Sequence, residues 1–136
     1  MLRKSIFTLV VLLLCSSGLY AQTFTPRNGT AYTVNILEYK ANGLDVNYPS
    51  RFPTITVTFY SDKVELKFEN SMGSAYFTFF HDGSFEQSSE TIFNARSVYC
   101  TGTGQFDRSG KDFVFTRSTE ESDGSVLYIS GKGRIR

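Results

Sequence analysis

The chain has 136 residues, a formal net charge of +1 and only two cysteines. Its 14 Lys and Arg balance 13 Asp and Glu, which argues against nucleic acid or an anionic membrane surface as a partner. The length is that of a single domain.

Residues 1–21 have the features of a cleaved signal peptide. Arg3 and Lys4 supply positive charge, Phe7 to Cys15 form an apolar run, and Ala21 offers a small residue for cleavage. The run is too short for a membrane-spanning helix, which needs about 20 apolar residues. We therefore expect cleavage after Ala21 and a secreted or periplasmic protein.

Residues 22–136 then form the mature domain. Loss of the two leader cations changes the formal net charge from +1 to −1. A lipoprotein anchored through Cys15 is disfavoured, because that chemistry needs a small residue before the cysteine and Leu14 is not small. Cys100 would remain as a single thiol, so an intrachain disulfide is not expected.

The first segments of this domain predict one strand followed by an irregular stretch. Ala31–Tyr39 is rich in β-branched and aromatic residues and favours a strand, with a short helix as the alternative. Lys40–Pro53 contains Asn42-Gly43 and two residues placed directly before a proline. Such turn signals make a helix unfavourable there.

The clearest pattern in the chain is a β-hairpin at Thr54–Phe68. Apolar and polar residues alternate along both halves, and Ser61-Asp62 lies between them as a two-residue turn. Period-two alternation in two runs joined by a tight turn is typical of an antiparallel pair with one solvated face.

Further strands are expected after this hairpin. Ala75–Phe80 leads to the turn His81-Asp82-Gly83, and Ser84–Glu86 begins the next strand. Gln87–Arg96 is compatible with either a helical turn or a continued strand.

The C-terminal part predicts another hairpin and a final strand. Ser97–Phe106 and Asp112–Arg117 are strands joined by a turn at Asp107–Gly110. A polar loop at Ser118–Ser125 precedes the last strand, Val126–Ile135.

These elements predict an all-β, single-domain antiparallel meander of about eight or nine strands. Gly102 and Gly104 share one strand face, as do Gly131 and Gly133, and such pairs permit sharp coiling, close approach of a bulky ring, or room for a ligand. They favour a small barrel over a two-sheet sandwich. In plan, this meander resembles the lipocalin-like barrels. The Gly-x-Trp signature of lipocalins is absent, so the resemblance assigns no residue a role.

Enzymatic chemistry finds little support in the sequence. His81 is the only histidine and lies in a turn, and Cys100 lies within a strand expected to be buried. Glu120, Glu121 and Asp123 lack the ordered spacing of an EF-hand loop. We therefore expect no enzymatic activity, no metal and no cofactor.

The function predicted from the sequence is binding of a small apolar or amphipathic ligand by an exported barrel. The ligand is expected between the sheet and the Lys40–Pro53 loop, since loops at a barrel mouth commonly bind. The alternative is a structural or protein-interaction β-sandwich of the cell envelope without a small ligand. The residues predicted to line the ligand site are Tyr48, Phe52, Tyr76, Phe79, Tyr99, Gly102, Gly104, Gly131 and Gly133.

Overall fold

The computed structural model describes residues 24–47, 52–91 and 102–136. The expected signal peptide lies outside this range, as do Tyr48, Tyr99 and Cys100. The described residues contain nine β-strands. These are β1 (Ala31–Ala41), β2 (Leu44–Asp45), β3 (Thr54–Phe59), β4 (Lys63–Asn70), β5 (Gly73–Phe80), β6 (Phe85–Thr91), β7 (Gly102–Ser109), β8 (Asp112–Glu120) and β9 (Val126–Ile135).

The strands form one nearly closed, barrel-shaped antiparallel sheet in the order β6-β5-β4-β3-β1-β9-β8-β7, with β2 paired to β1. Consecutive strands from β3 to β6 and from β7 to β9 are neighbours, and β9 returns to pair with β1. This is the expected up-and-down meander. Between β6 and β7, the described residues provide one isolated bridge, Ser84 with Thr103.

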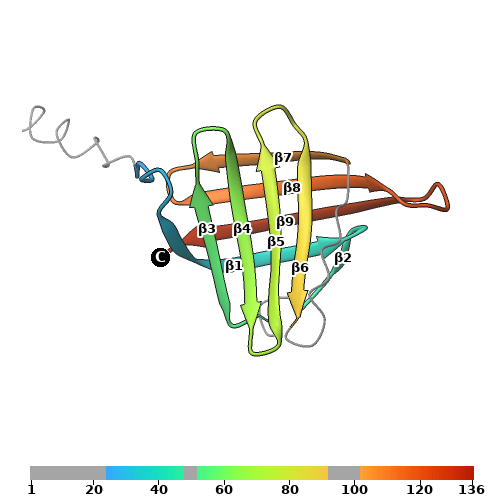
Figure 1. Ribbon diagram of the computed structural model, residues 1–136, viewed down its shortest axis with the longest axis horizontal. Coiled ribbons are helices and arrows are strands. Elements are labelled where there is room, and N and C mark those ends of the chain that lie inside the picture. Colours follow the sequence, from blue (N-terminus) through green and yellow to red (C-terminus); the bar gives the residue numbers. More distant parts are fainter. Residues whose placement is uncertain (1–23, 48–51, 92–101) are drawn as a thin grey trace, which may run out of the picture.

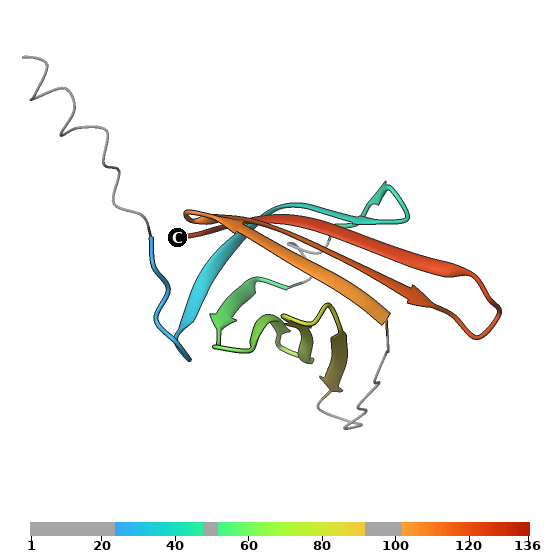
Figure 2. The same cartoon turned by 90° about the horizontal axis from the view of Figure 1, so that it is seen from above.

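The barrel is flattened into two layers joined by β1. Figure 1 shows β3 to β6 running across the direction of β7, β8 and β9, and Figure 2 shows the two layers facing each other. The first residues of β1 pair with β3, and the rest of β1 pairs with β9. One strand therefore belongs to both layers and turns the sheet from one into the other.

The predicted central hairpin is confirmed. Its strands pair from Thr54 with Glu69 to Phe59 with Val64, and Tyr60 N donates to Lys63 O at 2.9 Å, which leaves Ser61-Asp62 as the turn. Val57 and Leu66 face each other across the pair and are fully buried. The alternation of apolar and polar residues therefore predicted correctly which side chains of this hairpin are buried.

The first strand is also confirmed, with an irregularity that alternation does not predict. The register of β1 against β9 shifts between Ile36 and Glu38, which leaves Leu37 as an extra residue at a β-bulge. Val34 before the bulge and Tyr39 after it are both buried, although they differ in strand parity. Leu37 itself is 62% exposed.

Several element boundaries differ from the expectation. Ser109 pairs with Asp112, so the turn of that hairpin is Gly110-Lys111 rather than Asp107–Gly110. Gly110 has a φ of 56°, which suits the reversal, and the strand continues to Ser109. The region expected as a loop from Ser118 is strand up to Glu120.

Two further segments can be compared with the expectation. The start of Lys40–Pro53, expected to be irregular, instead contains the end of β1 at Ala41 and the strand β2. Gln87–Thr91 belongs to β6, in agreement with the strand alternative for that stretch, and residues 92–96 lie outside the described part. Asn42-Gly43 forms a two-residue turn between β1 and β2, with φ values of 50° and 80°. Positive φ at both central residues is the requirement of the preferred hairpin turn.

Half of the fourteen buried hydrophobic residues between the layers, counted over the described part of the chain, are aromatic. Phe68 packs against Phe77 and Tyr39, with ring centroids 5.2 and 5.9 Å apart. Phe115 lies 5.9 Å from Tyr39 and 5.8 Å from Phe79. Ring pairs at these separations stabilise a core beyond the area that they bury.

Candidate ligand-binding site

A hollow of about 530 Å³ opens at the end of the barrel that carries the β5–β6 turn. We call it the end hollow. Volumes between about 300 and 1,000 Å³ are usual for small-molecule sites. Its lining residues are Val64, Phe79, Phe80, His81, Asp82, Gly83, Gly104, Gln105 and Phe106.

The apolar floor of the end hollow follows from strand register. Val64 on β4 is paired with Phe79 on β5, so both side chains point to the interior. Phe106 on β7 approaches from the opposite layer, with its ring centroid 6.2 Å from that of Phe79. The floor is therefore built by strands far apart in sequence.

The polar rim is held by backbone hydrogen bonds between turns. His81 N donates to Asp62 O at 3.1 Å, which ties the β5–β6 turn to the β3–β4 turn. Gly104 N donates to Gly83 O at 2.7 Å and ties the same turn to β7. The exposed His81 side chain also borders a neighbouring hollow of about 490 Å³.

The β5–β6 turn is stabilised by its own side chains. Asp82 Oδ1 accepts hydrogen bonds from Ser84 N at 2.9 Å and from Ser84 Oγ at 2.6 Å. These bonds favour the ionised carboxylate and lower the pKa of Asp82 below its ordinary value. Gly83 follows with a φ of 88°. The rim therefore carries the negative charge of Asp82 beside the imidazole of His81.

Two of the predicted site residues, Phe79 and Gly104, lie together in the end hollow. Phe52 instead packs against the core residue Phe68 at a centroid distance of 5.8 Å. Tyr76 alternates with the inward-facing Phe77 and Phe79, and it lies beside Lys67, whose Nζ is 5.7 Å from its ring centroid. Tyr76 thus faces away from the interior.

The four predicted glycines lie in close contact with other groups. A Cβ on Gly104 would be 2.8 Å from Phe79 Cδ1, and a Cβ on Gly102 would meet Ser118 O and Phe85. At Gly131 and Gly133 a Cβ would meet the rings of Phe115 and Phe113. Phenylalanine rings thus fill much of the space that these glycines leave, which agrees with the alternative of close ring approach.

One cation, Arg117, faces the interior and was not among the predicted site residues. Arg117 on β8 is only 5% exposed, and its guanidinium carbon lies 4.7 Å from the ring centroid of Phe77 and 5.3 Å from that of Phe85. The signal was present in the sequence, because Arg117 continues the inward phase of Phe113 and Phe115.

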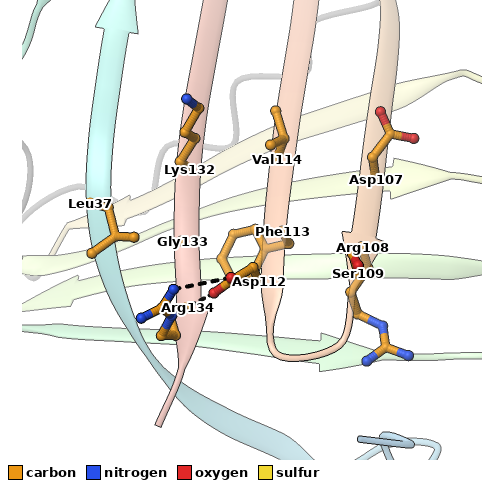
Figure 3. A pocket seen from close by; sticks show the side chains of 10 residues that line it. All are labelled: Leu37, Asp107, Arg108, Ser109, Asp112, Phe113, Val114, Lys132, Gly133 and Arg134. Atoms are coloured by element: carbon orange, nitrogen blue, oxygen red, sulfur yellow. Dashed lines mark hydrogen bonds and ion pairs between the residues drawn. The ribbon is translucent and has the colours of Figure 1, made fainter. Parts of the chain in front are cut away.

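A third hollow, of about 360 Å³, lies on the opposite face of β1, β9, β8 and β7. Figure 3 shows Lys132, Val114 and Asp107 in a row across adjacent strands, with Leu37 lower down on β1. The dashed lines mark the pair formed by Arg134 and Asp112, with Nε and Oδ1 2.5 Å apart. This pairing lowers the pKa of the Asp112 carboxyl.

No group of three His, Cys, Asp or Glu side chains is placed to hold a metal ion within residues 24–47, 52–91 and 102–136. In those same residues, no helix is long and apolar enough to cross a membrane. Comparison of the sequence with protein-family models finds no match, and searches of curated proteins and of solved structures find none either.

Proposed function

We propose that this protein is an exported, non-enzymatic β-barrel that binds a small apolar or amphipathic molecule. The observation that carries the proposal is the end hollow, where the apolar floor of Val64, Phe79 and Phe106 lies beneath the polar rim of His81 and Asp82. An apolar pocket with a few convergent polar groups is the usual form of a small-molecule site.

Export is proposed from the sequence features of residues 1–21. Binding without catalysis is proposed from the sequence, in which His81 is the only histidine and Cys100 lies within a strand expected to be buried. The rim supplies hydrogen-bonding groups, and the floor supplies an apolar surface, which together suit recognition of an amphipathic molecule.

Native mass spectrometry of the protein purified from its own source tests this function. We expect a mass above that of the denatured chain, with the excess lost on unfolding. In a second arm, His81→Trp should partly fill the end hollow and weaken binding of the identified ligand. Met72→Trp is the matched control, because Met72 is an exposed turn residue at the other end of β5.

A bare native mass together with unchanged binding of hydrophobic probes by the His81→Trp variant would contradict the proposal. A native mass at a clean multiple of the chain would favour the second candidate, a protein-interaction module. One observation supports that candidate: Leu37 is 62% exposed beside the hollow on the outer face.

A further inference from the structure

Arg117 is a buried charge within the barrel. Its side chain lies between the two layers, over the rings of Phe77 and Phe85, and 5% of the residue is exposed. Nε and Nη1 are both buried, and neither finds a hydrogen-bond acceptor in the described part of the chain. The ion pairs formed among described residues join Lys40 with Glu38, Lys67 with Glu69, and Arg134 with Asp112.

A buried guanidinium is energetically unfavourable when its N–H groups have no hydrogen-bond acceptor. A buried N–H donor that loses water and gains no acceptor costs about 1–3 kcal/mol, and more when the group is charged. Aromatic faces attract the cation, but they do not replace a hydrogen-bond acceptor for N–H groups in the guanidinium plane. Buried polar groups of this kind call for an explanation in a native structure.

Arg108 shows how the same chain satisfies an arginine placed over two rings. Its guanidinium carbon lies 5.7 Å from the ring centroid of Phe24 and 5.3 Å from that of Phe59. Its Nη1 also donates to Phe24 O at 2.9 Å and to Gly110 O at 2.6 Å. The ring contacts of the two arginines are alike. Arg108 is exposed, however, whereas Arg117 is buried and its Nε and Nη1 have no acceptor among the described residues.

A second unsatisfied group lies on the same strand face. Thr119 follows Arg117 by two residues, is 5% exposed, and its Oγ1 has no hydrogen-bond partner within the described residues. Residues two apart on a strand point to the same side, so both groups face the interior. A hydroxyl can donate to an anion that the guanidinium also binds.

We propose that Arg117, assisted by Thr119, binds the carboxylate of an amphipathic ligand inside the barrel. The inference rests on the proposed function and specifies the ligand as a carboxylic acid with an apolar chain. A single carboxylate matches the single guanidinium charge, whereas a doubly charged phosphate would bring an uncompensated charge into an apolar interior.

The end hollow and Arg117 are separated by one pair of rings. Phe79, in the floor of the hollow, stacks on Phe85 with centroids 6.2 Å apart, and Phe85 lies against the Arg117 guanidinium. A ligand that displaces these two rings places its carboxylate at Arg117 and its apolar chain along the floor of the end hollow.

Calorimetric titration with dodecanoate and with dodecanol tests the inference, because the two probes differ at the polar head. The wild-type protein should bind dodecanoate more tightly by about tenfold or more, the ratio expected for hydrogen bonds to a charged group. Arg117→Met should lower the affinity for dodecanoate to that for dodecanol. Arg134→Met removes an exposed arginine and should leave both affinities unchanged.

Thermal unfolding of the ligand-free variants separates a binding role from a structural one. Arg117→Met should unfold at the same temperature as the wild type or higher, because an unpaired charge is replaced by an apolar side chain. Dodecanoate should raise the unfolding temperature of the wild type and not that of Arg117→Met. Arg117→Lys keeps the charge and should retain part of the preference for dodecanoate.

Equal binding of both probes by the wild type, or unchanged dodecanoate binding by Arg117→Met, would overturn the carboxylate site and leave the binding function intact. A much less stable ligand-free Arg117→Met would also overturn it, by showing that contacts with the rings suffice to keep the arginine. Binding of neither probe by the wild type would refute the proposed function as well.

Discussion

Glycine and phenylalanine act as paired residues in this barrel. Gly131 lies beneath the ring of Phe115 and Gly133 beneath that of Phe113, and each phenylalanine is the direct cross-strand partner of its glycine. The absence of a Cβ lets each ring lie flat across the neighbouring strand. Arg117 continues the same inward row on β8, so one strand face presents two rings and then a cation.

Substitution at these glycines should destabilise the fold. Gly133→Ala places a Cβ against the Phe113 ring, and overpacking of this kind costs about 1–3 kcal/mol in the free energy of unfolding. Lys132→Ala is the control, because Lys132 is exposed on the other strand face and its loss should change stability by less than about 0.5 kcal/mol. Urea denaturation measures the free energy of unfolding of both variants. Equal stability of Gly133→Ala and Lys132→Ala would argue against the packing role of Gly133.

At the level of elements, two turns share the motif Asp-Gly-Ser. In each, the aspartate Oδ1 accepts hydrogen bonds from the serine N and Oγ, at 2.9 and 2.6 Å in the turn with Asp82 and at the same distances in the turn with Asp123. The glycines have φ values of 88° and 81°. The acidic residue Asp123, considered as a possible cation ligand, thus supports a hairpin turn.

The hydrogen bonds of Asp82 make the stability of its turn dependent on pH. The pKa of Asp82 is lower in the folded chain than its ordinary value of 3.8, chiefly through the Ser84 hydroxyl. The stabilisation is therefore complete above that value and is lost as the pH falls through the lower pKa of the folded state. Asp82→Ala should lower the unfolding temperature at neutral pH.

The difference between wild type and Asp82→Ala should shrink as the pH drops below 3.8, when thermal unfolding is followed by circular dichroism. Asp123→Ala should show the same pH dependence, because the pKa of Asp123 is lowered by the matching bonds to Ser125. A difference that persists undiminished in acid would mean that the Asp82 carboxylate is not the stabilising group.

For the whole molecule, the seam between β6 and β7 distinguishes this barrel from a fully closed one. Among the described residues, Ser84 and Thr103 form the bridge there, and Gly104 N donates to Gly83 O beside it. Every other junction around the sheet is a multi-residue ladder. The end hollow and Arg117 both lie next to this seam. For the ligand proposed above, the seam is the entrance that disrupts the least strand pairing.

Hydrogen exchange should reveal the seam as the least stable junction. The amide of Gly104 should exchange faster than that of Leu66 by about tenfold or more, since local opening at a short pairing costs less than opening of the central ladder. Bound dodecanoate should slow exchange at Gly104. Protection of Gly104 equal to that of Leu66 in the free protein would show that the seam opens only with global unfolding.

The amino-acid sequence by itself determined the all-β class, the antiparallel meander and most of its turns, because period-two alternation and turn residues are local properties. It also indicated close ring approach at the glycine pairs. Three local features were not predicted: the bulge at Leu37, the extension of β8 to Glu120 and the turn at Gly110-Lys111. Each depends on pairing with a partner strand.

The composition of the candidate site depends on tertiary structure more than the strands and turns do. Phe79 and Gly104 were predicted to line a pocket and lie together in the end hollow, but Val64, Phe106 and His81 join them only through the folding of separate strands. Arg117 could be assigned to the inner face from its phase, yet whether its Nε and Nη1 find an acceptor among the described residues depends on what the opposite layer provides. Alternation along a strand indicates which face a side chain occupies, except where a bulge such as that at Leu37 changes the phase, and the packing of distant strands determines what the side chain meets there.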